Sequence, residues 1–499
     1  MISGKGHWLR ENGVGTALTV AIVVVYLVEA FCSEGFHHPD EHFQIVEFAQ
    51  WKMGASTPAS VAWELPAHIR PSLQPCLCML LLAACRGLGI GSAFAQALAL
   101  RLVAAALSLT ALTAFYRANS KTMPTASRHL FMALTFLLWF LPAINVRFSS
   151  ESFSGACLLL CLAKVCAQRP SSVWRLFVIG VWAGLGFAFR YQLAFALTGL
   201  AGWALFTRRY TLRQCACIMA GFMLVTLACI CLDAWFYGQW VLVPYRYFHV
   251  NIIEGVASTF GQQPWYAYVM MLALRSTLPI GVMVLGALVV AMAHHYRHPA
   301  VWCLVAFVAG HSLVAHKELR FLFPIANLLP LMLVWGYDWL RRLRWTHAMV
   351  SVLFVLINSA GLAMMLTKPA AYGKTRMMRM ATEAWRQGHD LYVSDEGNPF
   401  LVAGFLEPSF YKAQEMPLHS LDDLMDDTAD AACTQHRTSG VAIVAQREEA
   451  RRQWLEQEGM TLVHRSVPRW VECINHLFRV YDPQWTLLMY APSNMKGMI

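Results

Sequence analysis

The chain has 499 residues, of which 57% are hydrophobic and only 14% are charged. Soluble domains carry about 25% charged residues, so this composition excludes an ordinary soluble enzyme and indicates a protein that crosses a membrane several times. The net charge of +10 does not indicate nucleic-acid binding, because lysine and arginine recur between apolar segments and form no basic stripe.

Apolar segments recur along the first three quarters of the chain. The first is too long for a signal-peptide core and lacks a clear cleavage site, so we expect a retained signal-anchor. Basic clusters between the segments mark cytoplasmic turns and predict about 11 membrane crossings, provided that 73–116 crosses once. That stretch is long enough for two helices, in which case one part of it is re-entrant or interfacial. The segments are 14–33, 73–116, 128–146, 151–167, 172–189, 190–206, 212–235, 266–293, 299–315, 320–340 and 346–366.

The composition changes after residue 367, where the chain becomes charged. Strand-like runs at 391–393 and 441–444 alternate with a helical run at 447–458. We therefore expect an all-α membrane domain over 1–367 and a small α/β domain over 368–499 on the non-cytoplasmic side. Cys433 and Cys473 would pair there if the compartment is oxidising.

In this topology the polar segments, including the loops 34–72 and 236–265, all fall on the non-cytoplasmic face. A transporter or flippase for a lipid-linked glycan, the alternative from another class, needs polar residues along a path through the bilayer. Their concentration at one face favours an enzyme that works at the membrane edge.

The first of these loops contains the polar run HHPDEHFQ. Pro39 suits the first turn of a helix, and Asp40 and Glu41 then lie at the positive end of the helix dipole. At 100° per residue Asp40, Gln44 and Glu47 share one face, which predicts an amphipathic helix on the membrane surface with a carboxylate at its rim. The alternative is a solvated helix start.

Five further groups of polar residues flank the apolar segments, where ionisable side chains are costly and indicate function. The alternative to function is structural. An arginine at a helix end can extend its charged head out of the lipid to water, and a carboxylate such as Asp233 can pair with a nearby arginine. On a helix Lys317 and Arg320 would lie on one side, and with His316 they would bind a phosphate or pyrophosphate. The groups are Glu64 with Arg70, Arg147 with Glu151, Arg190, Asp233 with Tyr237, and His316 to Arg320.

These parts suit glycosyl transfer from a lipid-phosphate sugar. A carboxylate near the lipid surface can deprotonate an acceptor hydroxyl, and cations can stabilise the departing phosphate. The isoprenoid tail of such a donor would lie among the helices, which explains a site at the membrane edge.

The motifs, in order, resemble the family 22 glycosyltransferases. These GT-C-fold enzymes include the α-mannosyltransferases of GPI-anchor and N-glycan assembly, and the first loop and residues 261–266 are most similar to the GPI mannosyltransferase III type. The resemblance covers about residues 30–330 and leaves out the tail. The motifs are HPDE at 38–41, WE at 63–64, IR at 69–70, RFSSE at 147–151, DAWFYG at 233–238, PW at 264–265 and HKELRF at 316–321.

The resemblance implies an inverting transfer of mannose from dolichyl- or polyprenyl-phosphate-mannose to a glycan or glycolipid. It implies that Asp40 is the catalytic base, that Glu41 supports it or binds the acceptor, and that no metal cofactor is needed. The donor phosphate would be bound by His316, Lys317, Arg320 and Arg147. The remaining substrate contacts would come from His38, Glu64, Arg70, Glu151, Arg190, Asp233 and Tyr237.

The third motif departs from the family pattern, since it reads Arg-Phe-Ser-Ser-Glu where Arg-Thr-x-Ser-Asn is usual. The acceptor and the donor sugar therefore stay open, and so does the location: the endoplasmic reticulum membrane of a eukaryote or the inner membrane of a bacterium. A metal-dependent variant, with Asp40, Glu41 and Asp233 holding Mg²⁺ or Mn²⁺, is a further alternative.

Overall fold

The computed structural model describes residues 3–121, 123–167, 172–207, 209–342, 346–413, 415–426 and 440–493. Its internal contacts divide the chain into two compact units. Unit 1 comprises Met1–Ala30, Glu64–Leu77 and Leu100–Ala363, and unit 2 comprises Phe31–Trp63, Cys78–Ala99 and Met364–Ile499. The sequence predicted one boundary, at residue 367, with all later residues in a second domain. The contacts instead place two earlier segments, 31–63 and 78–99, in the same unit as the C-terminal residues.

Unit 1 is helical. Its longer helices are α1 (Ser3–Cys32), α6 (Ala93–Ser120), α7 (Thr125–Leu137), α9 (Ser150–Cys166), α10 (Val173–Phe189), α11 (Ala194–Phe206), α12 (Leu212–Tyr237), α16 (Leu278–His294), α17 (Pro299–Leu313), α19 (Leu329–Leu340) and α20 (Thr346–Thr367). Shorter helices lie between them: α4 (Glu64–Ala67), α8 (Leu141–Asn145), η3 (Tyr191–Leu193), α13 (Val243–Phe248), η4 (His249–Ile253), α14 (Val256–Thr259), α15 (Ala267–Arg275), η5 (Leu319–Leu322) and α18 (Phe323–Ala326). Helix α5 (Leu73–Gly87) begins in unit 1 and ends in unit 2, whereas α6 begins in unit 2 and ends in unit 1. The last residues of α1 and α20 also belong to unit 2.

Four helical segments of the described chain are long and apolar enough to cross a membrane: Gly15–Cys32, Ala93–Ser120, Leu212–Tyr237 and Ala348–Thr367. A fifth span results if Leu319–Ala326 and Leu329–Leu340, which meet at a 74° bend, count as one. The stretch 73–116 holds two helices, α5 and α6, and only the second is among these four. The chain is therefore a multi-pass membrane protein, and the number of about 11 crossings stays a prediction.

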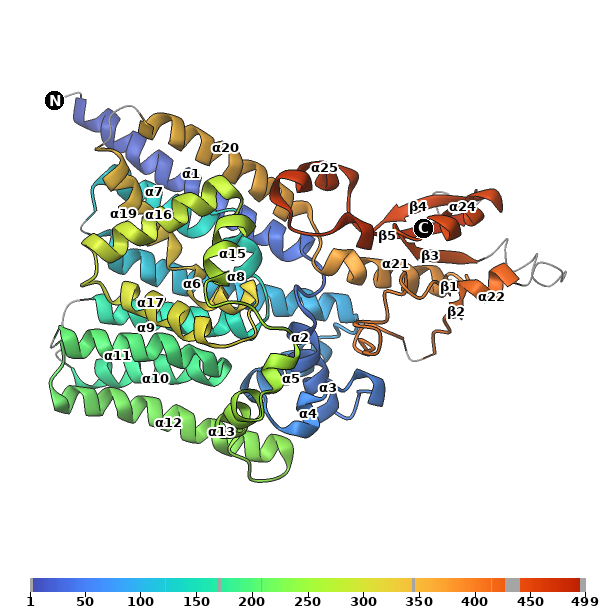
Figure 1. Cartoon of the computed structure of the whole chain (residues 1–499), viewed down its shortest axis with the longest axis horizontal. Helices are drawn as coiled ribbons and strands as arrows, with labels where there is room; N and C mark the ends of the chain where they lie inside the picture. The colour runs from blue at the N-terminus through green and yellow to red at the C-terminus, as the bar shows by residue number, and fades with distance from the viewer. Residues whose placement is uncertain are drawn as a thin grey trace. The chain divides into compact units, whose positions relative to one another are not determined.

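Helix α10 packs against both α9 and α12. Helices α10 and α12 run side by side (Figure 1), and glycines bring these two into backbone contact. A Cβ at Gly180 would lie 1.8 Å from the carbonyl oxygen of Ile218, and one at Gly221 would lie 2.1 Å from that of Phe177. In lipid, helices are held together by van der Waals packing and not by a hydrophobic driving force. Small residues favour such packing because they let two backbones approach closely.

Gly221→Ala should destabilise unit 1, because its methyl group would have to separate two backbones. Overpacking of this kind costs about 1–3 kcal/mol, so the melting temperature in detergent should fall. Gly286→Ala in α16 is the matched control: no heavy atom lies within 4 Å of its added Cβ, and alanine favours a helix. A Gly221→Ala protein that melts no earlier than Gly286→Ala would contradict this packing.

Unit 2 contains a five-stranded sheet with the strand order β2-β1-β3-β5-β4. Strand β1 is parallel to β2 and β3, whereas β5 is antiparallel to β3 and β4. The strands are β1 (Leu391–Val393), β2 (His419–Ser420), β3 (Val441–Ala445), β4 (Met460–Arg465) and β5 (Leu487–Pro492). The helices of unit 2 are α2 (Pro39–Glu41), η1 (His42–Val46), α3 (Glu47–Lys52), η2 (Pro58–Ser60), η6 (Ala371–Gly373), α21 (Lys374–Arg386), α22 (Leu421–Asp426), α24 (Glu449–Gln457), α25 (Arg469–Phe478) and η7 (Pro483–Trp485).

Both faces of the sheet are covered, so its central strand reads as a continuous apolar run. Val441 and Ile443 of β3 pack toward α21, and Ala442 and Val444 pack toward α22 and α24. The predicted strands at 391–393 and 441–444 and the predicted helix at 447–458 are confirmed. Cys433 lies outside the described residues, so its pairing with Cys473 stays a prediction.

Candidate active site

The acidic turn, residues 37–41, opens the first loop in unit 2. His38 caps α2 by accepting a hydrogen bond from the backbone N–H of Asp40 at 3.2 Å, and Pro39 begins the helix as predicted. The carboxylate of Asp40 lies 3.4 Å from Nδ1 of His38 and is 28% exposed. Glu41 accepts a hydrogen bond from the backbone N–H of His37 at 2.8 Å. A partly exposed carboxylate is thus held at the positive end of a helix beside an imidazole.

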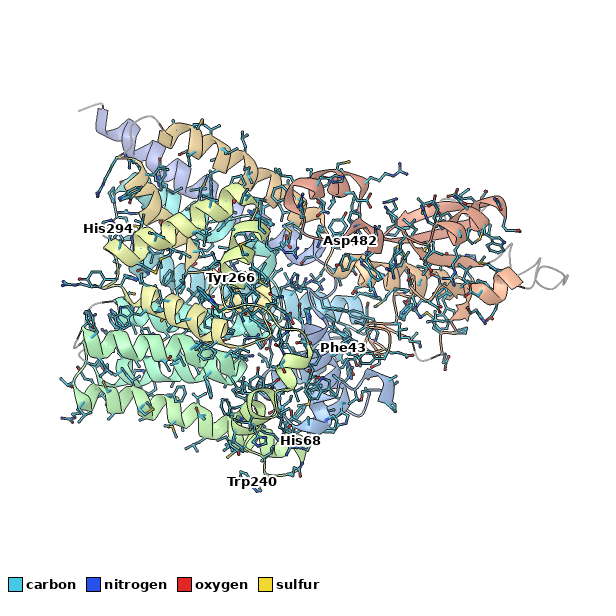
Figure 2. All side chains as sticks on the ribbon, viewed as in Figure 1. Phe43, His68, Trp240, Tyr266, His294 and Asp482 are labelled. Carbon is cyan, nitrogen blue, oxygen red and sulfur yellow. The ribbon has the colours of Figure 1, made fainter. Side chains whose placement is uncertain are left out.

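The helix that follows is buried on both sides, so the expectation of an amphipathic helix with one exposed polar face is wrong. The backbone passes into a π-helix at η1, so Glu47 is buried with 2% exposure and does not share a surface with Asp40. Side chains on both sides of the helix are covered by protein, among them Phe43 (Figure 2). The buried residues are His42, Phe43, Ile45, Val46, Glu47, Phe48, Ala49 and Gln50.

Unit 1 contains a network of two arginines and two glutamates, which we call the guanidinium cluster: Glu151, Arg190, Glu318 and Arg320. Nη1 of Arg190 donates to Glu151 at 2.8 Å, and Nη1 of Arg320 lies 3.7 Å from the same carboxylate oxygen. Arg320 is also hydrogen-bonded to Glu318 through two nitrogens. Both arginines lie over the ring of Phe321, at 5.4 and 5.1 Å from its centroid.

Three separate segments build this cluster. Glu151 lies in the first turn of α9, whose N-cap is Ser149, and Arg190 is the residue between α10 and η3. The two residues are 6% exposed each, so their charges are paired in a largely dry environment. Arg147 is buried just before α9, with 5% exposure.

Lys317 and Arg320 do not share one side of a helix, and this expectation is also wrong. Residues 316–318 are non-helical, and η5 begins only at Leu319. Nζ of Lys317 donates to the carbonyl oxygens of Val314 (2.6 Å) and Gln263 (3.0 Å), whereas Nε2 of His316 lies 2.8 Å from Glu318. Burial lowers the pKa of Lys317, so its charge is lost at a lower pH than that of a free lysine.

Asp233 and Tyr237, one turn apart on α12, hold the end of the first loop. The same carboxylate oxygen of Asp233 accepts from the backbone N–H (2.9 Å) and the hydroxyl (2.6 Å) of Ser72. Tyr237 donates to the carbonyl oxygen of Arg70 at 2.6 Å, and Arg70 pairs with Glu64 at 3.3 Å. These contacts give Asp233 a structural partner that is a serine and not an arginine, while its role toward substrate stays a prediction.

Asp233→Ala should lower the free energy of unfolding by about 1–3 kcal/mol, because it leaves the buried N–H of Ser72 without its acceptor. Asp233→Asn keeps an amide oxygen in the same place and should cost less. Thermal melting of the purified variants in detergent measures the difference. Equal melting temperatures for Asp233→Ala and the wild type would show that the hydrogen bonds of Asp233 to Ser72 do not stabilise the fold.

His68 lies beside Tyr237, and the centroids of the two rings are 4.7 Å apart. Burial, together with the charge of Arg246, lowers the pKa of His68. Arg246 itself donates to the carbonyl oxygen of Ala67 at 2.6 Å, so the short helix α13 is tied to the first loop.

No role was predicted for His42, which belongs to the polar run of the first loop, or for Ser72 at the end of that loop, and Glu47 was predicted only to share a polar face. Ser72 is a small hydroxyl residue before an apolar segment, which carries no recognisable pattern. His42 and Glu47 occur five residues apart, a spacing that brings side chains together only where the helix has a π turn. Among the residues that the structure describes, no group of three or more histidine, cysteine, aspartate or glutamate side chains could hold a metal ion.

The fold and the order of these residues agree with one family of proteins. The model of the Alg9-like mannosyltransferase family matches residues 17–389, and the chain belongs to this family.

The chain is similar to several GPI mannosyltransferases. The chain is 24% identical to GPI mannosyltransferase 3 of Aspergillus fumigatus over 490 residues, covering 79% of this chain and 60% of that protein. It is 34% identical to GPI mannosyltransferase 3 of Trypanosoma brucei brucei over 26% of this chain and 24% of that one. The chain thus spans less than two thirds of the length of these relatives.

Among solved structures, the chain is similar to ArnT from Cupriavidus metallidurans bound to undecaprenyl phosphate. The TM-score is 0.55, with 96% of this chain and 98% of that chain covered. At 12% sequence identity the similarity shows the fold alone, and it confirms the expected GT-C type of membrane fold.

Proposed function

We propose that the chain is an inverting mannosyltransferase that moves mannose from dolichyl- or polyprenyl-phosphate-mannose to a glycolipid acceptor of the GPI type. The observation that carries the proposal is its membership of the Alg9-like mannosyltransferase family. The curated relatives are GPI mannosyltransferases, and the ArnT structure of the same fold holds undecaprenyl phosphate.

Asp40 is the proposed general base. It removes the proton from the acceptor hydroxyl as the oxygen attacks the anomeric carbon, and the bond between that carbon and the phosphate oxygen breaks. His38 lies within reach of the carboxylate, which stands in the first turn of α2. Glu41, which holds the backbone of His37, supports the turn or contacts the acceptor.

The segment 316–320 and Arg190 are proposed to bind the donor phosphate and to stabilise it as it leaves. Arg190, Lys317 and Arg320 outnumber the carboxylates of Glu151 and Glu318 by one positive charge. Positioned cations in a site that excludes water stabilise the charge that develops on a leaving phosphate. Arg147 and His316 are proposed to assist them, and Glu64, Arg70 and Glu151 to contact substrate.

An exposed apolar stripe in the second loop suits a lipid-linked substrate. Along α13 and η4, Tyr245, Phe248 and Ile252 are 61%, 52% and 45% exposed, whereas Tyr247 between them faces Arg70 and is hydrogen-bonded to Gln192. Trp240, at the loop beyond α12, is 80% exposed (Figure 2). Aromatic and aliphatic residues of this kind favour the boundary between lipid and water.

We further propose that the active site and the C-terminal α/β region face the lumen of the endoplasmic reticulum, or the periplasm if the protein is bacterial. The basic clusters between apolar segments support this orientation, which corresponds to about 11 crossings.

Reconstitution in liposomes separates the transferase from a lipid-linked glycan transporter. With labelled polyprenyl-phosphate-mannose and an acceptor glycolipid, the proposal predicts label covalently bound to the acceptor. Movement of intact labelled donor across the bilayer, with no new glycosidic bond, would favour the transporter instead.

Transfer should persist in EDTA, because the proposed chemistry assigns the leaving phosphate to arginine and lysine side chains. The measurement is the initial rate with and without chelator, followed by addition of Mg²⁺ or Mn²⁺. A rate that disappears in EDTA and returns with either ion would favour the metal-dependent mechanism.

A further inference from the structure

Glu47 is a carboxylate in unit 2 that joins two distant parts of the sequence. Its Oε1 accepts from Nε2 of His42 and from the backbone N–H of Phe410, both at 2.9 Å. Its Oε2 accepts from the hydroxyl of Ser409 at 2.6 Å. The side chain is 1% exposed, and a buried carboxylate is tolerated only where several donors replace water.

A π turn brings His42 and Glu47 together. In an α-helix, residues five apart point about 140° away from each other. Here the backbone N–H of Glu47 donates to the carbonyl oxygen of His42, and this i→i+5 bond places one residue above the other. The ring of His42 also stacks between Phe36 (5.1 Å) and Tyr411 (5.2 Å), which fixes its direction.

This turn begins directly after the acidic turn. The carbonyl oxygen of Pro39 accepts from the backbone N–H of His42, so the orientation of α2 depends on where His42 is held. Turns of the π type are rare and occur frequently at functional sites. A displacement of about 1 Å at a catalytic group can cost about 100-fold in rate.

We propose that Glu47 is a positioning residue for Asp40, and that the C-terminal segment 409–411 is thereby part of the active-site scaffold. Glu47 fixes the π turn through His42, and Ser409 and Phe410 fix Glu47. The inference rests on the proposed role of Asp40 as the base. It predicts that a change more than 360 residues along the chain from Asp40 alters the chemical step.

Two variants of the purified full chain test this arrangement. Glu47→Gln keeps the size of the side chain and loses the charge and one acceptor, and Ser409→Ala removes a single donor. Lys412→Ala is the matched control in the same loop, because it breaks only the ion pair of Lys412 with Glu407, both partly exposed. Each protein is measured for kcat, for KM of the lipid donor, and for hydrogen exchange of the backbone amides at 40–50.

We expect kcat to fall about 10-fold or more in Glu47→Gln and about 3-fold in Ser409→Ala, with KM for the donor unchanged. Exchange of the backbone amides at 40–50 should rise in both, and Lys412→Ala should match the wild type in every measurement. Faster exchange with unchanged kcat would show a purely structural role, and unchanged exchange would refute the coupling; either overturns the inference. If the wild-type protein shows no transfer, the proposed function is refuted. Hydrogen exchange then still tests whether Glu47 and Ser409 hold the turn that carries Asp40.

Discussion

Asp40→Asn is expected to abolish transfer while the protein still folds and binds its donor. Asparagine has nearly the same shape but cannot accept a proton at neutral pH, so the acceptor hydroxyl would have to attack without a base. General base catalysis contributes about 100- to 10,000-fold, and kcat should fall by that amount. The measurements are the rate of mannose transfer and, separately, the affinity for polyprenyl phosphate.

Asp482→Asn provides the control for this substitution. Asp482 caps η7 by accepting from the backbone N–H of Gln484 at 3.1 Å, and asparagine caps helices equally well. This variant should transfer mannose at the wild-type rate. Retained turnover in a folded Asp40→Asn protein would remove Asp40 from the mechanism and direct attention to Glu41.

Arg320→Ala should lower kcat/KM for the donor by about 100- to 1,000-fold, the usual loss when one charge-stabilising donor is removed from an active site. Arg320 is the member of the guanidinium cluster that contacts both glutamates, so its loss also leaves Glu318 and Glu151 with less positive charge nearby. Arg320→Lys should recover only part of the activity, because an ammonium group cannot make the same two-pronged contact.

The matched control is Arg341→Ala. Arg341 is 49% exposed and its ion pair with Asp338, at 3.9 Å, is on a helix surface, where such pairs contribute little. Kinetics of the two alanine variants in the same detergent separate a local effect from a general loss of basic charge. A folded Arg320→Ala protein with wild-type kcat/KM would exclude Arg320 from donor binding.

Much of the architecture follows from local patterns in the sequence. Pro39 begins a helix because its ring favours the first turn, and the apolar run 441–444 is a central strand because both of its faces are covered. Neither conclusion needs knowledge of distant residues. The polar motifs are also short local patterns, so their order along the chain was sufficient to indicate the family.

The candidate site was less predictable where distant segments decide the geometry. The acidic face predicted for Asp40 and Glu47 assumed 100° per residue, and the π turn at 42–46 breaks that period. The backbone before Leu319 is extended and not helical, so Lys317 turns to the carbonyl oxygen of Gln263 and away from the side expected for it. Nothing near Ser72 in the sequence indicates its bond to Asp233, 161 residues away.

The most direct test of the central claim is transfer of labelled mannose by the purified protein in nanodiscs. Polyprenyl-phosphate-mannose is compared with GDP-mannose and with polyprenyl-phosphate-glucose, each with the same GPI-type acceptor. We expect an α-linked mannose product from the first donor alone. Transfer from GDP-mannose would contradict a lipid-phosphate donor, and transfer of glucose in preference to mannose would contradict the proposed sugar.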